Sequence, residues 1–179
     1  MLYWLMKRRL AAFEHNYHYD ASYVREILAA DWSAFLRFGR AVSLSRYSKG
    51  LPRLAWFAAG ITAVMAEDCG PCTQLAVTMA EREGVAPEIL AAIVAADVHA
   101  MPDDVLLAYR FTKATLTHDA NANELRQQIL RLWGQRALVS LAFAITTARI
   151  YPTIKYVLGH GQACQRVMVD GKSVLKQAA

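Results

Sequence analysis

The chain has 179 residues, enough for one domain with a substantial hydrophobic core and no need of stabilising cross-links. Apolar residues make up 55% of the sequence, and the formal net charge is only +5. This modest charge and the lack of an aromatic-rich basic motif argue against a nucleic-acid-binding protein. We expect the basic side chains to lie on solvated helical faces.

The apolar residues are distributed in short runs. The longest, residues 54–66, is well below the about 20 residues that a membrane-spanning helix needs, so no transmembrane segment is predicted. The surplus of apolar residues instead favours helices buried on more than one face, as in a bundle that also oligomerises. Residues 1–6 are apolar and precede three basic residues, the reverse of a secretory signal. They could form a packing arm on a neighbouring subunit or an interfacial anchor. With only three cysteines, a cytoplasmic location is expected.

The first half of the chain reads as a series of helices. Residues 1–50 are expected to form N-terminal helices, one of them capped by Asp31 and ending near Gly50. An apolar helix follows over residues 54–65. From position 72, apolar residues recur at the 3, 4, 7 spacing of one helical face. Gly84 is placed as a left-handed cap at the end of that helix, and Pro87 begins the next.

The second half continues in the same way. Helices are predicted over residues 87–97 and after residue 102, and Asn121 begins a segment with the spacing of a capping box. Gly134 interrupts this segment, and a buried helix is expected over residues 137–150, ended or kinked by Pro152. Only residues 167–172 look like strand and turn. We therefore predict a single all-α domain over residues 1–179.

A Cys-Gly-Pro-Cys motif at residues 69–72 is the sharpest chemical signal in the chain. Two thiols three positions apart can form a reversible disulfide. If a helix starts there, its unpaired N–H groups and positive dipole end favour a thiolate over a thiol. Pro71 suits the first turn of a helix, where its missing N–H leaves no bond unmade. In a cytoplasmic protein such a pair is more often redox-active or metal-binding than structural.

The motif has three other interpretations. Thioredoxin carries the same four letters, but there they follow a buried strand, whereas here they follow an alanine-rich helix end, so that fold is rejected. A zinc site needs four ligands. His160 and Cys164 could supply two, but nothing in the sequence places them near Cys69. Two buried, chemically inert cysteines remain an open alternative.

The chain resembles the AhpD-like alkylhydroperoxidase and carboxymuconolactone decarboxylase family. The resemblance covers roughly residues 50–160 and is carried by an acidic residue before a CxxC that opens a long helix. It extends to the acidic break at residues 102–104 and the alanine-rich helix at residues 137–148. It implies an all-α, AhpD-like helical bundle that assembles into homo-oligomers, as a trimer or a hexamer.

The resemblance also implies an activity, that of a thiol-dependent peroxidase or disulfide reductase. Cys72 would be the attacking thiolate and Cys69 its resolving partner. A small hydroperoxide would be the substrate, and an external dithiol or a thioredoxin-like partner would restore the pair. No glycine-rich phosphate loop is present, so no organic cofactor is expected, and no metal is implied.

The sequence departs from the family pattern at the proton relay. The family carries a histidine four residues after the second cysteine, where this chain has Ala76, and no glutamate occurs in residues 54–66. Glu67 lies close to the thiols, and His99 or His118 could come from later helices. The missing relay keeps a second hypothesis open, in which the chain is a non-catalytic, oligomeric binding or redox-sensor protein on the same scaffold.

Overall fold

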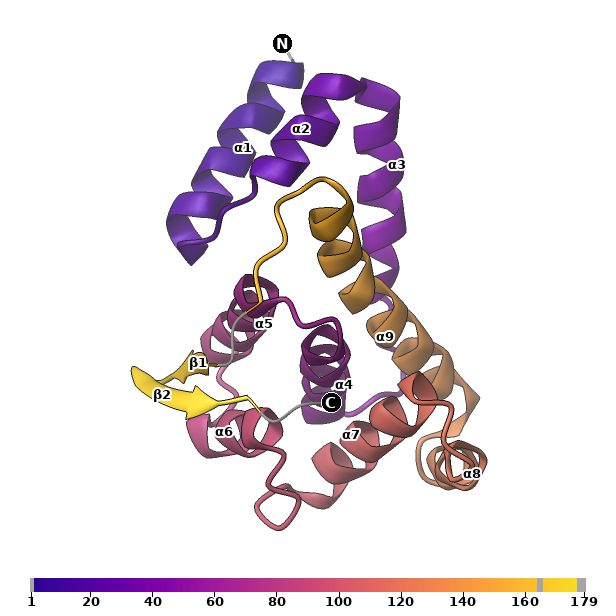
Figure 1. Ribbon diagram of the computed structural model, residues 1–179. Coiled ribbons are helices and arrows are strands. Elements are labelled where there is room, and N and C mark those ends of the chain that lie inside the picture. The colour runs from indigo at the N-terminus through magenta and orange to yellow at the C-terminus, as the bar shows by residue number, and fades with distance from the viewer. Residues whose placement is uncertain (1, 164–165, 177–179) are drawn as a thin grey trace.

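A computed structural model describes residues 2–163 and 166–176. The all-α prediction is confirmed, since helices dominate the described residues and the strands form one small hairpin (Figure 1). The α-helices are α1 (Leu2–Tyr17), α2 (Ser22–Ala30), α3 (Trp32–Val42), α4 (Arg53–Ala66), α5 (Gly70–Arg82), α6 (Pro87–Ala95), α7 (Asp103–Leu116), α8 (Ala122–Leu132) and α9 (Gly134–Val157). A 3₁₀ turn, η1 (Ser43–Arg46), follows α3, and the strands are β1 (Arg166–Val169) and β2 (Lys172–Leu175).

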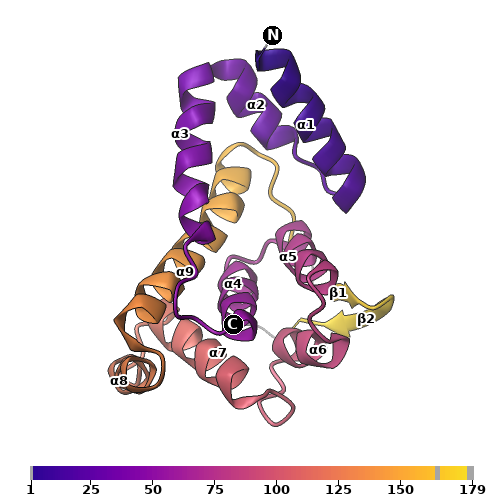
Figure 2. The same cartoon turned by 180° about the vertical axis from the view of Figure 1, so that it is seen from behind.

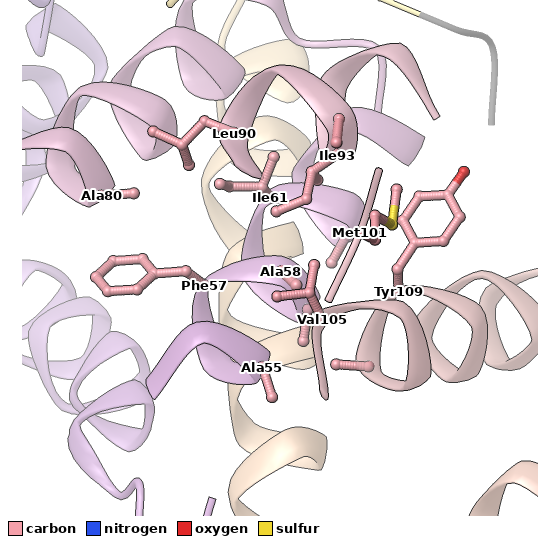
Figure 3. Packing of buried hydrophobic residues seen from close by; sticks show 14 of the residues in the cluster. Ala55, Phe57, Ala58, Ile61, Ala80, Leu90, Ile93, Met101, Val105 and Tyr109 are labelled. Carbon is pink, nitrogen blue, oxygen red and sulfur yellow. The ribbon is translucent and has the colours of Figure 1, made fainter. Parts of the chain in front are cut away.

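Helix α4 runs through the centre of the molecule, with α5, α6, α7 and α9 around it (Figures 1 and 2). Its sequence is rich in alanine, which lets neighbouring helices approach closely, and most of its residues are buried. Figure 3 shows Ile61 of α4 beside Ile93 of α6, with Val105 of α7 near Ala58. The prediction that a helix is buried on more than one face is confirmed for α4.

Helices α1 to α3 form a separate layer over one end of this core, here called the N-terminal layer (residues 2–42; Figure 1). It has a small hydrophobic cluster of its own, which includes Tyr19 and Tyr23 and is completed by Tyr151 and Ile154 of α9. The predicted cap of α3 is confirmed, because the Asp31 carboxylate accepts a hydrogen bond from the Ala34 N–H at 2.7 Å.

The predicted breaks and the hairpin are also confirmed. Gly84 has φ +77°, in the left-handed region, and Pro87 opens α6. Strands β1 and β2 pair antiparallel across a two-residue turn, Asp170 and Gly171, both with positive φ as such turns require. The buried Val167 of β1 ties the hairpin to the main core.

Two expectations about helix ends differ from the structure in part. The sequence predicts that Pro152 ends or kinks the last helix, and the structure rules out an end there, since α9 continues through Pro152 to Val157. Helix α8 begins after Asn121 as expected, but the Asn121 side chain makes no capping hydrogen bond. The Asn121 N–H donates instead to the carboxylate of Asp119, so the preceding turn, rather than a capping box, fixes this helix start.

Helix α9 is long and apolar enough, by length and composition, to cross a membrane. The core helix of a soluble protein passes the same test, and the property is weak evidence taken alone. In this structure α9 lies against α4 and buries Lys155 beneath the N-terminal layer. These contacts give α9 a structural role within the protein core.

Candidate functional site

The two cysteines of the motif lie at the N-terminus of α5, as predicted. Cys69 is the N-cap residue and Cys72 lies in the first turn, and they are joined by a disulfide with a Cα–Cα distance of 5.3 Å. Their side chains are 0% and 4% exposed, in a small cluster with Val64 of α4. The pair is therefore close enough to cycle between dithiol and disulfide, and in the disulfide form it is covered.

The turn before the pair is fastened by the C-terminal part of the chain. Asp68 has φ +51°, and its carbonyl accepts a hydrogen bond from the Tyr156 hydroxyl at 2.9 Å. The Gly70 N–H, at the first position of α5, donates to the Gln162 carbonyl at 3.0 Å. Pro71 has no N–H, so the amide of Cys72 is the first-turn donor left without a bond to the described residues.

The acidic residues beside the motif are neutralised by other partners. Glu67 forms an ion pair with Arg149 of α9, and Asp68 forms one with Lys176 after β2. A carboxylate next to a thiol disfavours the thiolate. Because these two carboxylates are each paired with a cation, their opposition to a Cys72 thiolate is reduced.

The residues around Cys72 in the first turns of α5 do not supply a proton relay. Ala76 packs against the cysteine cluster, on the same face as Cys72, as its spacing predicts. Gln74 turns away and exchanges two hydrogen bonds with the Met168 backbone of β1. The Thr73 hydroxyl donates to the Cys69 carbonyl. None of these three side chains offers a group that titrates near neutral pH.

A tyrosine from the N-terminal layer takes the place beside Cys72. The Tyr19 hydroxyl lies 3.8 Å from the Cys72 sulfur, within hydrogen-bond reach of a sulfur atom. A disulfide sulfur carries no hydrogen, so the phenol is the donor available to that contact in this state. The same hydroxyl donates to the Tyr23 hydroxyl at 3.5 Å, so its single hydrogen serves one of the two contacts at a time. Two phenols therefore line up from the sulfur into the N-terminal layer.

Local backbone structure places Tyr19 there. Helix α1 ends at Tyr17, and His18 adopts a left-handed conformation with φ +47°. The Tyr19 N–H then bonds to the Glu14 carbonyl at 3.1 Å, and the Glu14 carboxylate accepts the Ala21 N–H at 3.0 Å. This tight turn reverses the chain. It leaves Tyr19 6% exposed and in contact with Cys72 at the start of α5.

Burial keeps these phenols protonated. It raises the pKa of Tyr19 from 10.0 to about 12, because the phenolate would be desolvated. The pKa of Tyr23 is raised further by burial and by its phenol neighbour. At neutral pH both side chains are neutral hydrogen-bond donors, so Tyr19 can donate to a sulfur anion.

A lysine completes the cluster. Lys155 of α9 is 2% exposed, and its ammonium lies 4.7 Å from the centre of the Tyr19 ring and 5.4 Å from that of Tyr23. Burial lowers the pKa of Lys155, against a smaller opposing effect of the Asp20 carboxylate. The region around Cys72 therefore contains a buried cation held by aromatic faces.

The histidines considered from the sequence are not brought to the dithiol. His99 is exposed in the turn between α6 and α7, which Figure 1 shows at the bottom of the molecule, away from the start of α5 near its middle. His118 is exposed in the turn after α7. His160 pairs with Glu26 of α2 at 2.9 Å. Cys164, the other candidate zinc ligand, lies outside the described residues, and in the described ranges 2–163 and 166–176 no cluster of metal-ligating side chains occurs.

Tyr19 and Lys155 were missed by the sequence interpretation. They are 53 positions before and 83 positions after Cys72, and only the fold brings them together. One signal could have drawn attention to them. Tyr19 and Tyr23 are four apart, as are Tyr151 and Lys155, so each pair shares a helical face or its continuation. The charge of Lys155 gives no signal by itself, because the residue lies in the last turn of α9, where lysines are common.

Comparison of the chain with models of known protein families, with curated proteins and with solved structures gives no match. The resemblance to the AhpD-like family stays a prediction.

Proposed function

We propose that this protein is a dithiol–disulfide oxidoreductase that reduces a small hydroperoxide, with Cys72 as the attacking thiolate and Cys69 as the resolving thiol. The observation that carries the proposal is the disulfide at the start of α5 with the Tyr19 hydroxyl on the Cys72 sulfur. This site combines a cysteine pair that can be oxidised and reduced with a neutral hydrogen-bond donor, which contacts one of the two sulfurs.

The short span of the disulfide favours chemistry over a stabilising role. A bridge between residues three apart closes a very small loop, for which the loop-entropy relation gives only about 2 kcal/mol of stabilisation. The large core around α4 has no need of such a small contribution. A redox function explains better why two thiols lie at a helix N-terminus.

The reaction would run in two steps. The Cys72 thiolate attacks the outer oxygen of the hydroperoxide, so that an S–O bond forms, the O–O bond breaks and an alkoxide leaves. A proton converts the alkoxide to an alcohol. The Cys69 thiolate then attacks the sulfenic sulfur, forming the disulfide and releasing hydroxide, which a proton converts to water. An external dithiol restores the pair by exchange.

Tyr19 would fill the role that the missing histidine plays in the family. Its hydroxyl donates a hydrogen bond to the Cys72 thiolate and so stabilises the anion. With a pKa raised to about 12, it is still a much stronger acid than an alcohol, whose acidity is close to that of water at about 15.7. It can therefore give a proton to the leaving alkoxide.

Access to Cys72 requires movement of the N-terminal layer, because the sulfur is 4% exposed beneath Tyr19. The layer has its own small hydrophobic cluster, separate from the main core, so it can shift without unfolding α4. We place the homo-oligomeric assembly, the thioredoxin-like reductant and the cytoplasmic location within the same proposal.

The test is hydroperoxide turnover with dithiothreitol as the external dithiol. The wild-type protein should turn over an alkyl hydroperoxide, and Cys72→Ser should be inactive. Cys69→Ser should still consume one equivalent and accumulate a sulfenic acid at Cys72, detectable with a dimedone adduct. Retention of turnover in Cys72→Ser, or a sulfenic acid that forms at Cys69 in Cys72→Ser while none forms at Cys72 in Cys69→Ser, would refute the assignment of the attacking residue.

A second candidate function is a redox sensor, favoured by the burial of both sulfurs. A sensor would form the same disulfide without sustained turnover. Protection of α1 and α2 amides against hydrogen exchange would then differ between the reduced and oxidised states. A protein that is oxidised once by hydroperoxide, is not recycled by dithiothreitol on the assay timescale and changes exchange in these helices would fit the sensor and not the peroxidase.

A further inference from the structure

Lys155 is a buried lysine for which the described residues provide no ion pair. Its side chain is 2% exposed, and no carboxylate of residues 2–163 or 166–176 lies within ion-pair distance of its ammonium. A buried charge is unfavourable unless its surroundings offset it. The position of Lys155 in the last turn of α9 offsets part of its charge through the helix dipole. The two tyrosine faces supply part of the stabilisation.

The groups that face Lys155 come from three segments. Asp20 and the phenols of Tyr19 and Tyr23 come from the N-terminal layer. Tyr151 lies one helical turn before Lys155, and the His160 N–H donates to the Lys155 carbonyl at 2.7 Å. Asp20 is exposed and already accepts hydrogen bonds from the Ser22 side chain and backbone. None of these groups is a buried anion at neutral pH.

We propose that Lys155 is a positioning residue for the dithiol, whose ammonium acts through the Tyr19 ring to hold Cys72 as a thiolate once the disulfide is reduced. The inference deepens the proposed function and rests on it for the role of Cys72. It is carried by one chain of contacts, from the Lys155 ammonium to the Tyr19 ring face and from the Tyr19 hydroxyl to the Cys72 sulfur.

Two effects act in the same direction along that chain. A cation on the ring face draws electron density from the ring, so the phenol becomes a better hydrogen-bond donor toward Cys72. The ammonium and the thiolate also attract each other across a poorly solvated region, where charges interact more strongly than in water. Both effects lower the pKa of the Cys72 thiol.

Reduction is the step at which Lys155 gains its counter-charge. An external dithiol, R(SH)₂, reacts with the disulfide to give R(S–S), a Cys69 thiol, a Cys72 thiolate and one proton. Two electrons pass from the external dithiol to the protein disulfide. The anion formed lies near a cation that had no buried partner before, so reduction should raise the pKa of Lys155 by as much as Lys155 lowers that of Cys72.

The first test compares Lys155→Met, which removes the charge and keeps an unbranched side chain one atom shorter, with Lys155→Arg, which keeps the charge and can stack on the aromatic rings. Lys172→Met at an exposed position of β2 is the matched control. Each reduced protein is alkylated with iodoacetamide as a function of pH, and mass mapping reads each cysteine separately. No hydroperoxide is present, so the result is independent of peroxidase turnover.

We expect the pKa of the Cys72 thiol to rise by about one unit in Lys155→Met, which slows its alkylation at pH 7 by about tenfold. Lys155→Arg and Lys172→Met should alkylate within about threefold of the wild type. An unchanged Cys72 pH profile in a folded Lys155→Met protein overturns the inference. Absence of hydroperoxide turnover in the wild type would refute the proposed function. The effect of Lys155 on the pKa of Cys72 would still be measured by the alkylation profile.

A second measurement needs no variant. The pKa of the Lys155 ammonium, followed by NMR of the wild-type protein, should be higher in the dithiol form than in the disulfide form by about the same one unit. Equal Lys155 pKa values in the two forms contradict the coupling even if Lys155→Met fails to fold.

Discussion

At the scale of single residues, the site has a buried tyrosine, Tyr19, beside the Cys72 sulfur. The position that would carry the family's histidine, Ala76, lies beside the sulfurs but offers no proton, and the Tyr19 hydroxyl reaches Cys72 from a different part of the chain. A phenol and an imidazole differ in one property that matters here. The imidazole titrates near neutral pH, whereas Tyr19 stays protonated up to about pH 12.

This difference predicts the effect of placing a histidine at position 76. In Ala76→His, an imidazole one turn beyond Cys72 could pass protons to and from the thiol, so hydroperoxide turnover should rise several-fold. Overpacking against the cysteine cluster should lower the free energy of unfolding by about 1–3 kcal/mol. Turnover and urea unfolding of the wild type, Ala76→His, and Ala76→His with Cys72→Ser measure both effects. A folded Ala76→His protein with unchanged turnover would favour the sensor function.

The buried phenol also predicts a pH dependence of stability. The folded-state pKa of Tyr19, about 12, is above its ordinary value of 10.0, so its contribution is fully present below pH 10 and is lost as the pH rises toward 12. Two pKa units correspond to about 3 kcal/mol. Tyr19→Phe should therefore lose less stability between pH 10 and pH 12 than the wild type does.

Denaturant unfolding at pH 9, 10, 11 and 12 measures the slope. Tyr47→Phe, which removes a hydroxyl from an exposed side chain, serves as the control and should follow the wild type. If Tyr19→Phe and Tyr47→Phe show the same alkaline loss, the Tyr19 phenol is not protected by burial.

At the scale of helices, local sequence signals predicted most helix boundaries. They failed where contacts with distant segments determine whether a helix continues. Gly84 and Pro87 fixed the end of α5 and the start of α6, because a left-handed cap and a missing N–H act within one turn. Pro152 did not end α9, because buried contacts on both sides of it, including Lys155, hold the helix together. Such contacts between distant segments are not visible in the local sequence.

The two N-caps of α3 and α8 make this contrast testable. Asp31 accepts the Ala34 N–H, whereas Asn121 makes no side-chain cap bond. Asp31→Ala should lower the free energy of unfolding by about 1 kcal/mol, and Asn121→Ala should change it by less than about 0.5 kcal/mol. Equal losses in the two variants, measured by urea unfolding, would show that the cap geometry is not what stabilises α3.

At the scale of the whole molecule, the sequence predicted the fold class and the place of the dithiol but not the residues around it. The all-α class follows from helical periodicity, and the CxxC marks its own position at the start of α5. Tyr19 meets Cys72, and Lys155 meets the Tyr19 ring, only because the N-terminal layer folds over the C-terminal end of α9 and the start of α5 (Figures 1 and 2). A contact across 53 positions leaves no local pattern.

Assembly stays a prediction at this scale, and the structure gives it one further support. The first turn of α1 exposes four large apolar side chains, Leu2, Tyr3, Trp4 and Leu5, each at least 40% accessible. We expect a homo-oligomer in which they are covered. Sedimentation at micromolar concentration should give a mass well above the 19.9 kDa of the chain, and a species of 19.9 kDa would contradict the prediction.

The central claim is that Cys69 and Cys72 cycle between dithiol and disulfide, with a hydroperoxide as the oxidant. The most direct measurement is a single turnover of the fully reduced protein with a limiting alkyl hydroperoxide and no external dithiol, followed by mass mapping of all three cysteines. The account predicts one Cys69–Cys72 disulfide for each hydroperoxide consumed, reversed by dithiothreitol, with Cys164 left as a free thiol. Oxidation that leaves this pair reduced, or a disulfide formed mainly through Cys164, would contradict it.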